Sequence, residues 1–378
     1  MPQDFLPFTQ PFLSGRELEY VREAIETKSL VGDGPYTKKV EDLISQRCAG
    51  VATFLTPSCT DALDMTALML NLAPGDEVII PGFTFTSTAT AYAAQKATVV
   101  FADIDPQTLN IDPQSVENLI TNRTRAIVVV NYAGVACDFD ALGRIAQAHN
   151  LVLIEDNAHG FGGAYRDQAL GSIGDMGTLS FHATKNIQCG EGGALLTRVN
   201  EYAQRAHVFR EKGTNRRAFL DGEVDKYTWV DLGSSFLTAD YVAAFLQAQL
   251  EAFENIQARR ERIWNTYATE LTSWSQENAV TLPTIPDYAL HTHHLFWLKL
   301  AQPSQRPEFM AYLKSLGIGS TFHYQSLAQT TAGKKYGRSL GTPISDSTAE
   351  TLVRLPLFAD MTHSDAERVV DAVIGWKP

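Results

Sequence analysis

The sequence contains two short segments in which an apolar run ends abruptly in charged and polar residues. The first is Leu151–Glu155, followed by Asp156 and His159, and the second is Thr178–Phe181, followed by Lys185. Both runs have the composition of strands, and in open α/β sheets ligands bind at the carboxyl ends of strands. We therefore expect Asp156, His159 and Lys185 to lie at one site.

An aspartate and a lysine at two such strand ends match the two fixed partners of pyridoxal 5'-phosphate (PLP). The lysine forms a Schiff base with this cofactor, and the aspartate keeps its pyridine nitrogen protonated, so the ring can accept the electrons of a broken C–H bond. Because the amine must be neutral to attack and to move protons, we expect its surroundings to lower the pKa of Lys185. Each residue alone has an ordinary alternative, a surface lysine or a helix-capping carboxylate. Their combination favours the cofactor.

A third element fits the phosphate of the same cofactor. Ser58 and Asp61 form a Ser-x-x-Asp capping pattern at the start of an expected helix, where free N–H groups and the helix dipole attract anions. An ordinary helix cap would give the same pattern without a ligand. Ser180, five residues before Lys185, could add a hydroxyl to the same phosphate.

These motifs resemble those of the DegT/DnrJ/EryC1/StrS family of sugar aminotransferases, which are fold-type I PLP enzymes acting on nucleotide-linked keto sugars. The resemblance covers nearly the whole chain and rests on Glu-Asp-x-x-His at 155–159, Ser-Phe-His-x-x-Lys at 180–185 and Gly-Glu-Gly-Gly at 190–193. It implies a homodimer with composite active sites. It also implies roles for individual residues: Lys185 as the Schiff-base lysine, Asp156 as the partner of the pyridine nitrogen, His159 and Phe85 as the flanks of the ring, and Ser180, Cys59 and Thr60 as phosphate ligands.

Four further segments resemble one subgroup of that family, the transaminases of enterobacterial common antigen synthesis that make dTDP-4-amino-4,6-dideoxy-D-galactose. They are residues 57–60, 132–137, 210–216 and 224–229. The subgroup implies transfer of nitrogen from L-glutamate to C4 of dTDP-4-dehydro-6-deoxy-D-glucose, with release of 2-oxoglutarate. The gluco 4-epimer and a 3-amino product remain alternatives, because a sequence does not display how the sugar lies over the cofactor.

The chain differs from the wider family at the segment that reaches the partner's phosphate, and it keeps the Schiff-base lysine of the aminotransferases. The family commonly carries an asparagine that reaches the phosphate of the partner subunit, where this chain reads Gly-Ser-Ser-Phe-Leu at 233–237, so Ser234 or Ser235 is the expected substitute. Dehydratases of the family replace the Schiff-base lysine by histidine, so Lys185 favours transamination. A non-catalytic regulator built on the same fold is a further alternative. The intact set of Asp156, His159 and Lys185 speaks against it.

The charge of the chain restricts where an anionic substrate can bind. The formal net charge is −12, which speaks against nucleic acid or an anionic membrane surface as a partner. Anions therefore need local cations, and basic residues gather between 205 and 226. A solvated basic face explains that cluster equally well from charge alone. We expect Lys212 and Arg216 to lie near the nucleotide sugar, with His323 and Tyr324 as a further wall of that site.

Alternating apolar runs and amphipathic segments predict an α/β fold with a mostly parallel central sheet. The expected strands are residues 77–80, 98–102, 126–130, 151–155, 178–181 and 194–197; the expected helices are 61–72, 113–119 and 138–149. One long helix is expected over 240–271, then a strand over 294–300 and helices over 307–316 and 364–374. We divide the chain into a large PLP-binding domain, 1–250, and a small α+β domain, 251–378.

Two features bear on the cellular compartment and on metals. The first residues, Met1–Asp4, lack the basic region of a secretory signal and no apolar run is long enough to span a bilayer, which predicts a cytoplasmic protein. The four cysteines form no Cys-x-x-Cys pair and the histidines are not clustered in a ligand pattern, so the sequence indicates neither a zinc site nor a disulfide framework.

Overall fold

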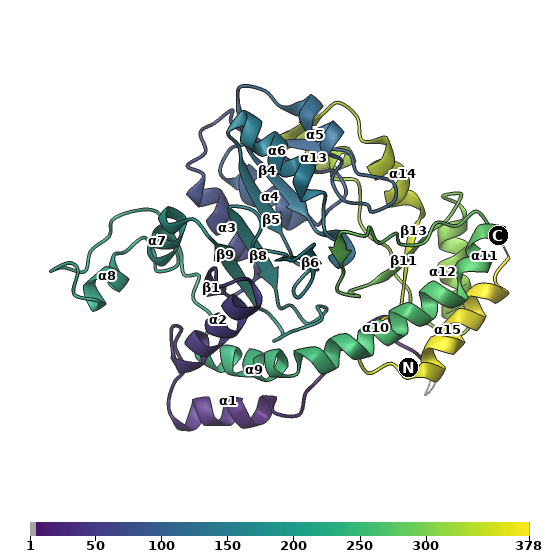
Figure 1. Ribbon diagram of the computed structural model, residues 1–378, viewed down its shortest axis with the longest axis horizontal. Helices are drawn as coiled ribbons and strands as arrows, with labels where there is room; N and C mark the ends of the chain where they lie inside the picture. Colours follow the sequence, from purple (N-terminus) through teal and green to yellow (C-terminus); the bar gives the residue numbers. More distant parts are fainter. Residues whose placement is uncertain (1–4, 378) are drawn as a thin grey trace.

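The computed structural model describes residues 5–377, so the segment Met1–Asp4 considered above lies outside it. A central sheet of eight strands, in the order β1-β9-β8-β5-β4-β2-β3-β12, forms the body of the molecule (Figure 1). Adjacent strands run parallel except β9, which is antiparallel to both neighbours. The strands are β1 (Ala52–Thr56), β2 (Glu77–Pro81), β3 (Thr98–Ala102), β4 (Thr124–Val130), β5 (Val152–Asp156), β8 (Met176–Ser180), β9 (Gly193–Thr197) and β12 (Gly337–Ser339).

The mostly parallel sheet confirms the predicted fold class, and all six strands predicted in this region are present within two residues of their expected starts. Their continuous apolar runs are buried on both faces, as helices covering both sides of a parallel sheet require. Two strands of this sheet were missed. β1 reads Ala-Thr-Phe-Leu-Thr and β12 only Gly-Arg-Ser, so neither has a long apolar run to reveal it.

Helices from the first 150 residues pack on the large sheet or beside it, as do two short helices from the C-terminal part of the chain. They are α1 (Glu17–Glu26), α2 (Pro35–Arg47), α3 (Cys59–Met69), α4 (Thr86–Ala94), α5 (Pro113–Leu119), α6 (Phe139–His149), α13 (Thr331–Tyr336) and α14 (Pro343–Thr351). The predictions for α3, α5 and α6 are confirmed, and α5 has the predicted bounds. Asp112 and Asp138 cap α5 and α6 by accepting backbone N–H groups, which explains where these helices start.

The single helix predicted over 240–271 is wrong in one respect, because the segment forms two helices, α9 (Asp240–Glu251) and α10 (Phe253–Glu270). Ala252 ends the first helix and precedes the second, and its backbone departs from helical geometry (φ −89°, ψ 5°). No proline or glycine marks this break, so the sequence pattern does not reveal it. α9 packs against α1 and α2, while α10 runs away from the sheet toward the C-terminal part of the chain (Figure 1).

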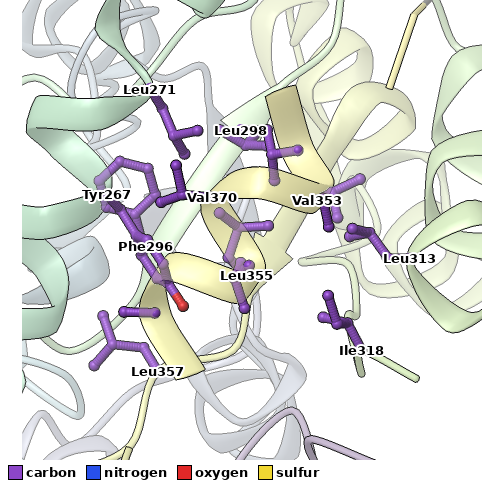
Figure 2. Close-up of a cluster of buried hydrophobic side chains, with 14 of the residues drawn as sticks. Tyr267, Leu271, Phe296, Leu298, Leu313, Ile318, Val353, Leu355, Leu357 and Val370 are labelled. Atoms are coloured by element: carbon purple, nitrogen blue, oxygen red, sulfur yellow. The ribbon is translucent and has the colours of Figure 1, made fainter. Parts of the chain in front are cut away.

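The C-terminal part of the chain has its own apolar core around a two-stranded antiparallel pair. β11 (Phe296–Lys299) pairs with β13 (Leu352–Leu355), and α10, α11 (Thr272–Glu277), α12 (Gln305–Ser315) and α15 (His363–Gly375) surround them. Figure 2 shows side chains of this core, among them Phe296, Leu298, Val353 and Leu355, all at most 1% exposed. The predicted strand and both predicted helices of this region are therefore present.

Two contacts cross the proposed division at residue 250. β12 joins the edge of the large sheet, and Leu6, near the N-terminus, lies in the C-terminal core and bridges to Ile318. These contacts tie the two parts of the chain together. Small pairings of β6 (Ala164–Tyr165), β7 (Gln168–Ala169) and β10 (Ala289–Leu290) add a third link.

A segment with few contacts to the sheet projects from the body beyond α7 (Asn200–Phe209). It contains α8 (Arg216–Leu220) and runs to residue 235, and it extends to the far left in Figure 1. Residues 219–235 are all exposed. We call residues 211–235 the arm. None of the helices within residues 5–377 has the length and apolar character needed to cross a membrane.

Candidate active site

The strand ends named by the sequence meet in one cavity. β5 and β8 are parallel neighbours, with Asp156 in register with Thr178, so Asp156 and Ser180 project from the same edge of the sheet. A cavity of about 580 Å³ opens there and is lined by Asp156, His159, Ser180 and Lys185. The structure therefore brings together the residues that the sequence placed at two separate strand ends.

Lys185 faces this cavity without an ion-pair partner among residues 5–377. Burial lowers the pKa of Lys185 to about 8, and the charge of Arg354 acts in the same direction, while Cys59 and Asp156 partly oppose them. A large fraction of the amine is therefore neutral near pH 8. This is the state that an attacking amine requires.

Asp156 is a buried carboxylate whose oxygens face the same cavity. Thr88 Oγ1 donates a 2.7 Å hydrogen bond to Asp156 Oδ2, and the Ala158 N–H donates to Oδ1 at 3.3 Å. Burial raises the pKa of Asp156, and these two hydrogen bonds and Lys185 oppose that rise. A cationic N–H placed against this carboxylate would stabilise its charged form.

The start of α3 also lines the cavity. The Ser58 hydroxyl accepts the Asp61 N–H at 3.0 Å, so Ser58 is an ordinary helix cap as well as a cavity residue. Cys59 and Thr60 occupy the first turn, where backbone N–H groups have no partner inside the helix. A Cβ on Gly193 would lie 2.4 Å from the Cys59 nitrogen, so the close approach of β9 to this turn requires glycine. The arrangement is suited to a phosphate.

Aromatic side chains form further walls of the cavity. Phe85, immediately before α4, is 58% exposed at the cavity although it is large and apolar. His159 is buried, accepts the Ala133 N–H on Nδ1 at 3.3 Å, and has the Tyr324 hydroxyl 3.4 Å from Nε2. Burial, with Lys185 and Arg354, holds the pKa of His159 well below its usual value, so the ring is neutral. Since Nδ1 accepts, the neutral ring carries its proton on Nε2.

His323 and Tyr324, predicted as a substrate wall, also line the cavity and come from the C-terminal part of the chain. Their rings stack at 4.0 Å with planes 8° apart, and His323 Nδ1 lies 3.2 Å from the Tyr132 hydroxyl. The pair forms part of the cavity wall. Because the two rings are stacked, this wall offers a ligand aromatic ring faces and edges rather than flexible side chains.

Three predicted residues do not reach this cavity within one chain. Lys212, Arg216 and Ser235 all belong to the arm, outside the cavity lining. Arg216 pairs instead with Glu211 at 3.1 Å, and Glu211 forms a backbone bridge to Ser235. Their roles as ligands of substrate and phosphate stay predictions that depend on a second subunit.

Arg210, part of the same basic cluster in the sequence, has a different environment from the arm. Its guanidinium is buried and forms ion pairs with Asp33 at 2.7 Å and Glu41 at 3.1 Å. Both of its terminal nitrogens are occupied by buried or half-buried acids, so Arg210 does not belong to a basic binding face. It anchors α7, and the base of the arm, to the body.

The residues of the site that sequence reasoning missed include Thr88, His294 and Arg354. Thr88 lies in an alanine- and threonine-rich helix, which offers no signal. His294 precedes β11, its Nδ1 lies 2.8 Å from Asn186 Oδ1, and its ring centroid is 4.4 Å from that of His159. Arg354 did offer a signal, a lone cation inside the apolar run Leu352–Leu355.

The residues present fit PLP. A buried carboxylate without an ion pair, a cavity-facing lysine without an ion pair and a helix start with free N–H groups surround one cavity among the described residues. Lys185 would hold the cofactor, Asp156 would contact its ring nitrogen, and the turn at Cys59 with Ser180 would receive the phosphate. The cofactor supplies an electron sink for a broken C–H bond.

Comparison with known proteins agrees with this arrangement. A model of the DegT/DnrJ/EryC1/StrS aminotransferase family matches residues 12–374. The aminotransferase TlmJ from Streptoalloteichus hindustanus is 30% identical, with a TM-score of 0.89 over 98% of this chain and 97% of TlmJ. DesV from S. venezuelae is 28% identical, with a TM-score of 0.89 over 98% of both chains.

A third similar structure bears on the cofactor. The putative sugar aminotransferase Spr1654 from Streptococcus pneumoniae is 25% identical, with a TM-score of 0.89 over 97% of this chain and 98% of Spr1654 in its PMP form, and a PLP form is also similar. The match over nearly the whole chain, together with the site geometry, shows a PLP-dependent sugar aminotransferase: the chain belongs to the DegT/DnrJ/EryC1/StrS aminotransferase family.

Proposed function

We propose that this aminotransferase moves the amino group of L-glutamate to C4 of dTDP-4-dehydro-6-deoxy-D-glucose. The products are dTDP-4-amino-4,6-dideoxy-D-galactose and 2-oxoglutarate. The observation that carries the aminotransferase chemistry is the cavity that joins Lys185, Asp156 and the start of α3. The identity of the sugar rests on the four subgroup-like segments 57–60, 132–137, 210–216 and 224–229, of which the last two fall at or within the arm.

In this proposal, each residue of the cavity has a separate role in the reaction. Lys185, whose lowered pKa leaves a large neutral fraction near pH 8, would take a proton from the donor carbon and return one on the other side of the exchange. Asp156, held by Thr88, would keep the ring nitrogen of the cofactor charged. The neutral His159 would pack against the ring, with its orientation fixed by Ala133 and Tyr324.

We further propose a homodimer in which the arm of one subunit reaches the cavity of the other. The arm exposes large apolar side chains that a monomer would leave in water, including Trp229 at 75%. The set is Phe219, Leu220, Val224, Tyr227, Trp229, Val230 and Leu232. Burying them in a two-fold interface would bring Lys212, Arg216 and Ser234 or Ser235 toward the phosphates of the partner's ligands.

We also propose a pathway and a cellular compartment for this reaction. Synthesis of an amino sugar for a surface polysaccharide such as enterobacterial common antigen fits a nucleotide-linked product. The enzyme would then act in the cytoplasm, where dTDP-sugars are made.

The test of the sugar assignment is the product itself. Wild-type holoenzyme is incubated with dTDP-4-dehydro-6-deoxy-D-glucose and L-glutamate, and the purified product is examined by proton NMR. A C4-bound nitrogen with a small H3–H4 coupling supports the galacto product. A large H3–H4 coupling identifies the gluco epimer, a nitrogen on C3 identifies a 3-amino sugar, and unreacted keto sugar rejects this substrate; each contradicts the proposal.

A further inference from the structure

The strand β13 directs one arginine toward the cavity. Val353 and Leu355 are buried in the C-terminal core, as Figure 2 shows, and Arg354 lies between them. Because successive side chains of a strand point to opposite faces, Arg354 points away from that core. On that side it lines the same cavity as Lys185 and Asp156.

The guanidinium of Arg354 lacks an anionic partner within residues 5–377. Its Nε is buried and has no hydrogen-bond acceptor, and the contact of its guanidinium that the structure shows is with the face of the Phe8 ring, 4.5 Å from the centroid. Leaving a buried donor of a charged group unpaired is costly. The position of Arg354 therefore needs an explanation other than packing.

Other arginines with buried or half-buried guanidinium groups have acceptors for their terminal nitrogens, although the Nε of Arg210 also lacks one. Arg210 pairs with Asp33 and Glu41, and Arg338 makes two hydrogen bonds to Glu77, at 2.9 and 2.8 Å. Arg260, also buried, donates to the backbone carbonyls of residues 293 and 294. In contrast, the guanidinium of Arg354 has no hydrogen-bond acceptor among the described residues, and it lines the cavity.

The surroundings of Arg354 do not neutralise it. Its charge lowers the pKa values of His159, His294 and His323, which burial already keeps neutral, and it interacts with the hydroxyls of Tyr132 and Tyr324. The acids that line the cavity are Asp156, which the site assigns to the cofactor ring, and Glu191, whose side chain is mostly exposed beside His182. An anionic ligand would supply the missing charge.

We propose that Arg354 binds a carboxylate of the amino donor. This rests on the proposed function, in which a dicarboxylate donor and a keto sugar use the cavity in turn. The start of α3 is the expected seat of the cofactor phosphate, whereas Arg354 comes from the C-terminal part of the chain, as do His323 and Tyr324. A guanidinium fork matches a carboxylate with two parallel hydrogen bonds.

Glutarate tests this directly, because it carries two carboxylates but no amino group to transfer. Its dissociation constant is measured by titration calorimetry on holoenzyme of the wild type, Arg354→Gln, Arg354→Lys and the surface control Arg125→Gln. The glutamate and keto-sugar half reactions are followed separately through the visible absorbance of the bound cofactor. That absorbance and the melting temperature verify that each variant is folded and loaded.

We expect Arg354→Gln to raise the glutarate dissociation constant and the glutamate concentration for half-maximal rate by roughly 10- to 100-fold. Arg354→Lys should recover part of this loss, and the keto-sugar half reaction and the Arg125→Gln enzyme should be unchanged. An unaltered glutarate constant in Arg354→Gln, or a defect confined to the keto sugar, would overturn the assignment. If glutamate fails as donor for the wild type while glutarate binding still depends on Arg354, the carboxylate site stands and the proposed donor falls.

Discussion

The Thr88 hydroxyl donates a 2.7 Å hydrogen bond to the buried carboxylate of Asp156, from a helix 68 residues earlier in the chain. Thr88 is itself fully buried, and its oxygen lies 2.9 Å from the Thr84 hydroxyl. The hydrogen bond stabilises the charged carboxylate against the effect of burial. The charge of Asp156 therefore depends on a residue from a distant part of the chain.

Replacing Thr88 tests this dependence. Thr88→Val removes the donor at nearly constant volume and should lower kcat roughly tenfold, since a hydrogen bond to a charged group contributes about 1.5–3 kcal/mol. The KM for the nucleotide sugar should stay the same. Steady-state kinetics measure both constants, and Thr88→Ser, which keeps the hydroxyl, should retain most activity. Equal kcat values for wild type and Thr88→Val would show that Asp156 does not need this donor.

The lowered pKa of Lys185 predicts how the apoenzyme takes up its cofactor. With a pKa of about 8, the neutral amine grows from a minor fraction at pH 7 to the major form at pH 9. The rate at which apoenzyme mixed with PLP develops its visible absorbance should therefore rise roughly tenfold between these pH values and level off above them. Stopped-flow mixing across this range gives the profile. A rate that keeps climbing past pH 10 would mean that Lys185 has an ordinary lysine pKa.

The arm should carry the dimer interface and part of the partner's site. Trp229→Asp introduces a charge among the exposed apolar side chains of the arm and should shift the protein toward monomer, with activity lost in parallel. Light scattering with activity measured at the same concentrations tests this, and Leu290→Asp, at an exposed apolar position outside the arm, is the matched control. A fully active monomer would contradict the composite site.

Charge on the arm should matter for the nucleotide sugar. Lys212→Ala and Arg216→Ala should each raise the KM for the nucleotide sugar by roughly ten- to a hundredfold, as expected for loss of a charge-assisted contact, without changing the visible spectrum. Arg217→Ala, a neighbour paired with Asp221, serves as control. Wild-type KM values in both variants would reduce this cluster to a solvated basic face.

Acid should destabilise the protein through its buried neutral histidines. Burial lowers the pKa of His291 to about 3. A lowered histidine pKa means that the unfolded state binds the proton first, so stability is full above about pH 6.5 and is lost as pH falls from there toward the folded pKa. Between pH 7 and pH 5 this loss is about 1–2 kcal/mol for one partly buried histidine. His291→Gln should show a correspondingly smaller loss in denaturant titrations at the two pH values, whereas His149→Gln, at an exposed position, should not. Equal losses in all three proteins would contradict it.

The sequence predicts the elements of this fold well where burial is continuous. Strands such as Ala126–Val130 are apolar throughout because helices cover both faces, and that pattern needs no tertiary information to recognise. The short strand Gly337–Ser339 was missed because its extended conformation is stabilised by pairing with β3 and its own residues have no strand pattern. The break at Ala252 was missed for a similar reason, since packing rather than a local breaker ends the helix.

Only those residues of the candidate site that come shortly after a strand could be predicted from the sequence. Asp156, His159 and Lys185 do so, and the structure brings them together. Thr88 and His294 lie on a helix and a loop whose composition is unremarkable, so their contribution becomes visible only through contacts with distant residues. The position of Arg210 could not be predicted either, because a cluster of basic residues along the chain does not reveal that one of them is buried against Asp33 and Glu41.

The central claim, that Lys185 holds pyridoxal phosphate, is tested most directly by fixing the cofactor in place. Holoenzyme is reduced with borohydride, digested, and its peptides are analysed by mass spectrometry. We expect a pyridoxyl group on Lys185, in the segment between Phe181 and Gly190, and no such group on any peptide from the Lys185→Ala protein. A pyridoxyl group on another lysine of the native enzyme, or on none, would contradict it.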